Sequence, residues 1–165
     1  MLRPFLILCT VLTAASASII AQATVRIESA NLQSLRPLQE QTGRAAIRDY
    51  LNSWQVLTAA FEQNRADLLD PDFVGSAKDT LTATIQQQTA LGISTHFQDR
   101  AHVLQLVFYS PEGLSIELTD NVEYDVQLLD HGRVTTVQHV SAKYVVVLTP
   151  AEVRWRVRVF QGTPR

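Results

Sequence analysis

The chain has 165 residues, of which 46% are hydrophobic and 18% are charged, and its formal net charge is −2. This hydrophobic fraction is enough to bury the core of one ordinary domain, and it argues against a chain that is disordered by composition. General nucleic-acid binders are usually clearly basic, so the slightly acidic balance argues against that class of protein.

The first 23 residues have the features of a cleavable secretory signal peptide. Arg3 supplies a positive charge, an apolar run extends from Phe5 to Ala15, and Ala21-Gln22-Ala23 fits the small-x-small pattern of a cleavage site. Ala15-Ser16-Ala17 offers an earlier site. The apolar run is shorter than the ~20 residues that span a bilayer, so we expect no membrane span after cleavage. The prediction is export to the periplasm or to the outside of the cell.

Cys9 is the only cysteine, and it lies within this signal segment. Cleavage after Ala23 removes it, so we expect neither disulfides nor thiol catalysis in the mature chain. An exported domain without disulfides is more typical of a bacterial periplasm than of a small eukaryotic secreted protein.

Helices are expected in the first half of the mature chain. Residues 24–42 are mixed in polarity and only weakly periodic, which indicates a polar leader in front of a domain at 43–162. From Gly43 onward, apolar residues recur every three or four positions, which predicts a long amphipathic helix. The members of this stripe are Ile47, Tyr50, Leu51, Trp54, Leu57 and Phe61.

A short helical turn and a second long helix follow. We expect the turn at Ala66–Leu69, ended by Asp70-Pro71, because a residue before proline avoids the helical region. The Ser76 hydroxyl is the expected cap of the second helix, since it can accept a hydrogen bond from a free backbone N–H. Gly92 is the expected left-handed residue that stops this helix.

After Gly92 the hydrophobic period changes to two, which predicts four strands. They are expected at about 101–109, 114–128, 134–148 and 153–159. In the second strand, apolar residues occupy the even positions and polar residues the odd ones, so one face is buried and the other is wet. Helices followed by a meander of strands indicate an α+β fold, with the helices on one face of an antiparallel sheet.

Four stretches of this pattern carry a family resemblance. They are Tyr50 with Trp54, Leu68-Leu69-Asp70-Pro71-Asp72-Phe73-Val74, Tyr144-Val145-Val146-Val147-Leu148 and Val153-Arg154-Trp155-Arg156-Val157. In pattern and order they resemble the nuclear transport factor 2-like superfamily, which includes SnoaL-like and ketosteroid-isomerase-like domains, over about Ala45 to Gln161. The resemblance implies a cone-like fold in which N-terminal helices pack on a curved antiparallel sheet, often around a cavity. Members include enzymes, ligand binders and interaction modules, so the fold alone does not decide the function.

A catalytic site of the isomerase-like kind needs a carboxylate base in that cavity. Asp120 is one candidate because it shares the even positions of its apolar neighbours, and Asp99 is another because it precedes a strong strand. The alternative is that Asp120 lies at a bend facing water and that Asp99 lies in a solvated loop. His139 shares parity with nearby valines, so a dyad with either aspartate stays open. No residue is assigned as catalytic.

No cofactor or metal is expected from the motifs. His96 and His102 are separated by six residues, which is not the spacing of a helical or tight-turn metal site. The chain has no P-loop, dinucleotide-binding or nucleophile-elbow motif.

Four aromatic residues, Tyr50, Trp54, Tyr124 and Tyr144, lie on apolar faces. Such residues either fill the core or line a cavity for a small hydrophobic ligand, with a tyrosine hydroxyl as the polar contact. Both interpretations stay open.

Charged stripes mark two of the expected strands. Arg154, Arg156 and Arg158 form a basic stripe on the last strand, and Glu117, Glu123 and Asp125 form an acidic stripe on the second. If the two strands lie in one sheet, the stripes can pair across it and give a solvated, charge-paired outer face. Otherwise the open sheet face would offer a docking surface for a partner or for a second copy in a homodimer.

The leading hypothesis is therefore an exported, non-catalytic ligand-binding or protein-interaction module. The alternative is a small-molecule isomerase or cyclase that uses a cavity carboxylate. A third hypothesis is a structural dimer without a ligand.

Overall fold

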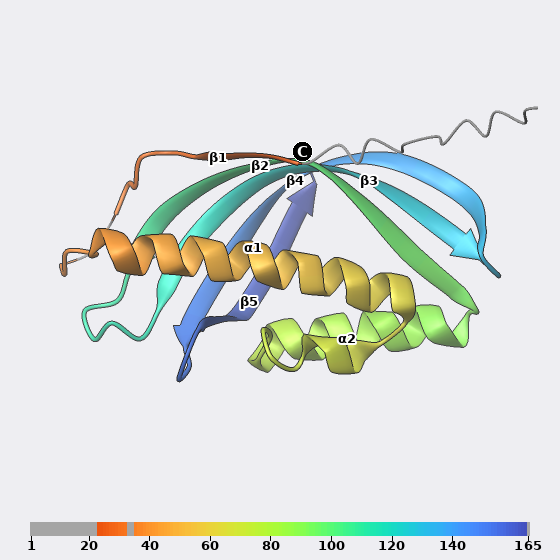
Figure 1. Ribbon diagram of the computed structural model, residues 1–165, viewed down its shortest axis with the longest axis horizontal. Coiled ribbons are helices and arrows are strands. Elements are labelled where there is room, and N and C mark those ends of the chain that lie inside the picture. The colour runs from red at the N-terminus through yellow and green to blue at the C-terminus, as the bar shows by residue number, and fades with distance from the viewer. Residues whose placement is uncertain (1–22, 33–34, 165) are drawn as a thin grey trace, which may run out of the picture.

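The computed structural model describes residues 23–32 and 35–164. The predicted signal segment spans residues 1–23, of which 1–22, with Cys9, lie outside the described residues, so it stays a prediction. The elements in chain order are β1 (Thr24–Ile27), α1 (Glu40–Gln63), the 3₁₀ helix η1 (Ala66–Leu69), α2 (Gly75–Ala90), β2 (Ile93–Tyr109), β3 (Ile116–Asp130), β4 (Arg133–Pro150) and β5 (Trp155–Pro164). The curved sheet arches over α1 and α2, which both lie on its concave side (Figure 1). The expected α+β arrangement is confirmed.

The sheet has the order β1-β2-β3-β4-β5, and β2 to β5 form the predicted antiparallel meander. β1 adds a parallel strand, in which Thr24 faces Ala101 and Ile27 faces Leu104. The sheet is therefore mixed, and the expected polar leader begins with a strand. Four residues are too few for a periodic signal, which is why the sequence pattern did not reveal this strand.

Helix α1 forms because its apolar stripe is buried against the concave face of the sheet. Tyr50, Trp54 and Leu57 are all buried, as the spacing predicts. The helix begins at Glu40, three residues before the expected start. Within the described residues, neither helix is both long and apolar enough to cross a bilayer.

The segment between α1 and β2 follows the prediction except at one cap. The turn at Ala66–Leu69 is present as η1, and Gly92 has the expected positive φ of 70°. Helix α2, however, begins at Gly75 after an extended Val74, and no side chain caps it. Ser76 instead donates a hydrogen bond to the carbonyl oxygen of Arg158, 3.1 Å away. Contact with β5 therefore replaces the cap that the sequence suggested.

Strand order separates the two charged stripes, so the expected pairing between them is wrong. The basic stripe lies on β5 and the residue before it, the acidic stripe lies on β3, and β4 separates the two strands. Arg154 bonds the Asp72 carboxylate at 2.9 Å, and Arg156 donates to two backbone carbonyls of the η1–α2 connection. The arginines thus hold this connection against β5.

Gly162 of β5 lies beneath an aromatic ring of the neighbouring strand. It pairs with Tyr144, and a Cβ added at 162 would lie 2.7 Å from ring carbon Cε1 of Tyr144. We expect Gly162→Ala to lower the free energy of unfolding by about 1–3 kcal/mol, because the Tyr144 ring must move. Urea unfolding measures this change. Thr163→Ala, at the exposed next position, should stay within about 0.5 kcal/mol of the parent, and an equal loss in both variants would contradict the steric explanation.

Candidate functional site

Five side chains meet between α1 and the middle of the sheet, and we call them the buried polar network. They are Tyr50, Trp54, Asp99, His102 and Asp120. The Tyr50 hydroxyl donates to Asp120 Oδ2 at 2.8 Å, and His102 Nδ1 lies 2.7 Å from the same oxygen. The Trp54 indole N–H donates to Asp99 Oδ1 at 2.7 Å. His102 Nε2 lies 4.0 Å from Asp99 Oδ2, so the imidazole stands between two carboxylates.

The positions follow from helix and strand periodicity. Tyr50 and Trp54 are four residues apart and therefore share one face of α1. Alternation along β2 turns His102 inward, and alternation along β3 turns Asp120 inward. In the antiparallel register, His102 faces Val122 and Leu104 faces Asp120, so His102 and Asp120 are diagonal neighbours within reach of each other.

Burial decides between the two interpretations of Asp120. Its exposed fraction is 0%, and those of Tyr50 and His102 are 1% and 2%. The expectation that Asp120 lies at a bend facing water is therefore wrong. Asp99 is also not in a solvated loop: it lies on β2, which begins at Ile93 instead of about 101, and it is partly buried beside a register shift.

The network sets the protonation of its members. Burial lowers the pKa of His102, but the hydrogen bonds and charges of Asp120 and Asp99 outweigh burial and raise that pKa from 6.5 to about 9. Burial and the nearby Asp120 raise the pKa of Tyr50 well above its usual value, so its hydroxyl stays a donor. At neutral pH the core therefore holds an imidazolium between two acidic side chains.

His139 does not join this network. It lies on the outer face of β4, where its Nδ1 is 2.9 Å from Asp125 Oδ1 and Arg100 bonds the other oxygen of that carboxylate. The dyad of His139 with Asp120 or Asp99, which the sequence left open, is therefore not formed. β4 carries valines on both faces, so parity with valines did not identify its inner side. The histidine beside both aspartates is His102, and its parity with Leu104 and Leu106 was the signal that sequence reasoning missed.

The four aromatic residues expected at a ligand site do come together. The Trp54 ring packs edge-on against Tyr124 and Tyr144, with centroids 5.7 and 5.5 Å away. The Tyr124 and Tyr144 hydroxyls are 3.0 Å apart, and Tyr144 stacks on Phe160 at 4.5 Å. Tyr50, Trp54 and Tyr124 are buried. These rings thus fill the cone by contacting one another, and a ligand-binding role for them stays a prediction.

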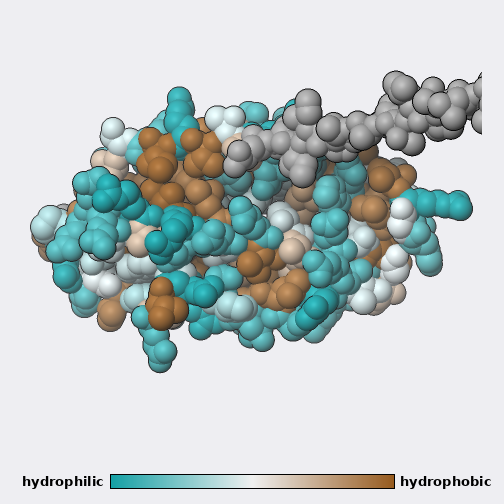
Figure 2. Space-filling model, in the orientation of Figure 1, coloured by the Kyte–Doolittle hydropathy of each residue, from teal (hydrophilic) through white to brown (hydrophobic). Residues whose placement is uncertain are grey.

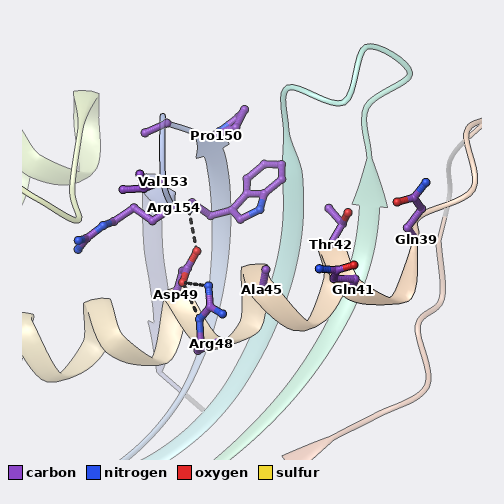
Figure 3. Close-up of a pocket in the computed structure, with 11 residues that line it drawn as sticks. Gln39, Gln41, Thr42, Ala45, Arg48, Asp49, Pro150, Val153 and Arg154 are labelled. Atoms are coloured by element: carbon purple, nitrogen blue, oxygen red, sulfur yellow. Dashed lines mark hydrogen bonds and ion pairs between the residues drawn. The ribbon is translucent and has the colours of Figure 1, made fainter.

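A surface cleft of about 380 Å³ lies where the start of α1 meets the β4–β5 turn (Figure 3). Asp49 lies at its base, where it accepts hydrogen bonds from Arg48 and from the Trp155 backbone N–H, the latter at 2.8 Å. The cleft is open and separate from Asp120. In the part of the chain that the structure describes, no group of three or more His, Cys, Asp or Glu side chains is placed to hold a metal ion.

Stability should depend on pH through His102. Its pKa is raised in the folded state, so its stabilisation is complete below about pH 6.5 and is lost as the pH rises through about 9. We expect the free energy of unfolding to fall by up to about 3 kcal/mol over this interval. Urea unfolding at a series of pH values measures it. His139→Gln should leave the fall unchanged, and a flat profile between pH 6.5 and 9 would show that His102 is not charged.

Removing one hydroxyl tests the bond to Asp120. Tyr50→Phe should lower the free energy of unfolding by about 1.5–3 kcal/mol, because the lost bond has a charged acceptor. Tyr144→Phe removes a hydroxyl bonded to neutral Tyr124 and should cost only about 0.5–1.5 kcal/mol. Chemical denaturation of both variants checks the order of the two losses, and the reverse order would contradict the stronger bond between Tyr50 and Asp120.

Comparison with known proteins gives matches in structure only. No family model matches the chain, and no curated protein matches its sequence. The intermembrane space region of the chloroplast protein ARC6 superposes with a TM-score of 0.60 and 12% identity, over 78% of this chain and 98% of that one.

Two further solved structures share the architecture. A putative scytalone dehydratase from Novosphingobium aromaticivorans has a TM-score of 0.54 and 10% identity, over 77% of this chain and 89% of that one. Aln2 from a Streptomyces species has a TM-score of 0.51 and 10% identity, over 78% and 94%. At such identities the likeness concerns the fold alone. The two helices packed on a curved five-stranded sheet agree with the cone-like fold that the sequence resemblance implied.

Proposed function

We propose that this domain is an exported, non-catalytic interaction module that binds other polypeptides through its surface. The observation that carries the proposal is the closure of the buried polar network. Asp120 and His102, the groups best suited to acid–base chemistry, are at most 2% exposed and are bonded to their neighbours.

General acid–base catalysis requires the base to lie about 2.6–3.2 Å from the heavy atom whose proton it removes. Asp120 Oδ2 already has Tyr50 and His102 at this distance. Trp54 covers the network from the helix side, where it bonds Asp99 and packs against the His102 ring at 5.1 Å. A substrate would have to displace this tryptophan, so the arrangement supports a filled core better than an open active site.

The surface is better suited to binding than the cone is. On the outer face of the sheet, Arg100, Asp125 and His139 form a charged cluster that links three neighbouring strands. On the face shown in Figure 2, hydrophobic residues form separate patches among hydrophilic ones. Patches of this kind are typical of protein contacts, where apolar area is ringed by polar groups.

A second candidate function is the isomerase or cyclase type of enzyme. Asp120 Oδ1 is buried and has no hydrogen-bond partner among the described residues, and this free acceptor favours the candidate. The fold shared with a putative scytalone dehydratase is compatible with it. In such an enzyme Asp120 would be the base and His102 the proton donor, and the cone would have to open beside Trp54.

Titration with 2-naphthol, a planar mimic of an enol, distinguishes the two functions. We expect no saturable change in the His102 imidazole NMR signals or in Trp54 fluorescence at 2-naphthol concentrations up to ~1 mM. A dissociation constant of ~1 mM corresponds to a binding free energy of about −4 kcal/mol. Trp54→Ala serves as the positive control, because the space it opens should admit the probe. Circular dichroism checks that this variant is folded. Saturable shifts in the parent protein would contradict the non-catalytic interaction module and favour the enzyme.

A further inference from the structure

The first half of β4, residues 133–141, is an open edge of the sheet. β5 pairs with β4 only from Ala142 to Pro150, whereas β3 pairs with it from Arg133 to Leu148, with Thr135 left out. Residues 133–139 are all exposed. In this stretch, the backbone N–H and C=O groups that point away from β3 have no strand partner among the described residues. A stretch of nine residues is about 30 Å long.

Apart from one β-bulge and Arg133 at its start, this edge lacks the features that usually prevent pairing with another chain. Natural edges are kept short, carry lysine or proline, or turn charges inward. Residues 134–141 include no lysine, proline or acidic residue, and five of the eight are β-branched: Val134, Thr135, Thr136, Val137 and Val140. The one irregularity is a bulge, because Leu128 faces Thr136 and Leu129 faces Val134.

The bulge also creates an apolar patch on the outer face. It leaves Thr135 without a paired residue and brings Val134 to the same face as Val137 and Leu129. Val134 and Val137 are 53% and 61% exposed. The open edge and the exposed valines therefore coincide, so one partner strand would satisfy the backbone groups and cover the apolar side chains together.

We infer that this edge pairs with the same edge of a second copy of the chain, antiparallel and related by a two-fold axis. An axis perpendicular to the sheet keeps both outer faces on one side, so the two patches join. A register centred on Val137 sets the two Val137 side chains against each other and places Thr135 opposite His139 of the other copy. No two charges of like sign face each other in this register, so the edge is complementary to itself.

The opposite edge explains why the assembly closes as a dimer. β1 is only four residues long and has Arg26 in it, paired at 2.9 Å with Glu28 just beyond its end. Short, charged edges resist pairing. On β5, the η1–α2 connection covers part of the outer edge, with Phe73 bridged to Val157. β1 and the bridged part of β5 are therefore less suited to pairing than the first half of β4, where two copies complete the arrangement.

Light scattering and sedimentation of the full chain test the dimer. The expected result is a dimer whose dissociation constant rises at least ~10²-fold in Val137→Lys, because two like charges then face each other. Val153→Lys is the matched control, since this valine is 81% exposed in the β4–β5 turn and away from the edge. Its dissociation constant should be unchanged. Circular dichroism confirms that both variants are folded.

Disulfide trapping tests the register. With Cys9→Ser removing the only other thiol, Val137→Cys should give a covalent dimer on air oxidation, because facing residues have Cβ atoms about 4.5–5.5 Å apart. Val153→Cys should not.

A monomer at ~100 µM, a dimer that Val137→Lys leaves intact, or binding of a foreign strand to a monomeric chain would overturn the inference. None of these results depends on whether the cone is catalytic, so the dimer and the proposed function fail separately.

Discussion

The buried carboxylate of Asp120 constrains the elements around it. A charge without water is strongly unfavourable unless hydrogen bonds and an opposite charge compensate for it. Tyr50 of α1 and His102 of β2 provide this compensation at 2.8 and 2.7 Å, while Asp120 itself belongs to β3. Sliding the helix or shifting the strand register by one residue would leave a charge unpaired in the core. The network therefore fixes how α1 sits on the sheet.

The same network explains why the cone is filled. The imidazolium of His102 needs both Asp120 and Asp99 beside it, and Asp99 in turn holds the indole of Trp54. The Trp54 ring then meets Tyr124 and Tyr144, which close the space between helix and sheet. A fold that can enclose a ligand cavity is here occupied by its own side chains. The binding surfaces that we propose therefore lie on the outside, at the charged cluster and at the sheet edge.

The contacts of β5 determine which part of the outer surface of the sheet is left uncovered. Its arginines hold the η1–α2 connection, and its pairing with β4 stops at Ala142. The far half of the β3–β4 hairpin thus extends past the last strand. The open backbone edge results from this difference in strand length, and the bulge in the same stretch brings Val134 to the face of Val137. The interaction surface that we infer is a consequence of topology and not of a sequence motif.

Local structure could be predicted from the amino-acid order alone: the apolar stripe of α1, the alternation of β3, the short turn at Ala66–Leu69 and the stop at Gly92. These features depend on residues close together in the chain, whose spacing fixes the face on which each side chain lies. The same spacing placed Asp120 on the apolar face of its strand.

Which residues meet became clear only from the folded chain. The fold paired Asp120 with His102 in place of His139, and it separated the arginine stripe from the acidic one, because spacing does not specify register or strand order. β1 escaped detection since its four residues are stabilised by β2, more than 70 positions away in the chain.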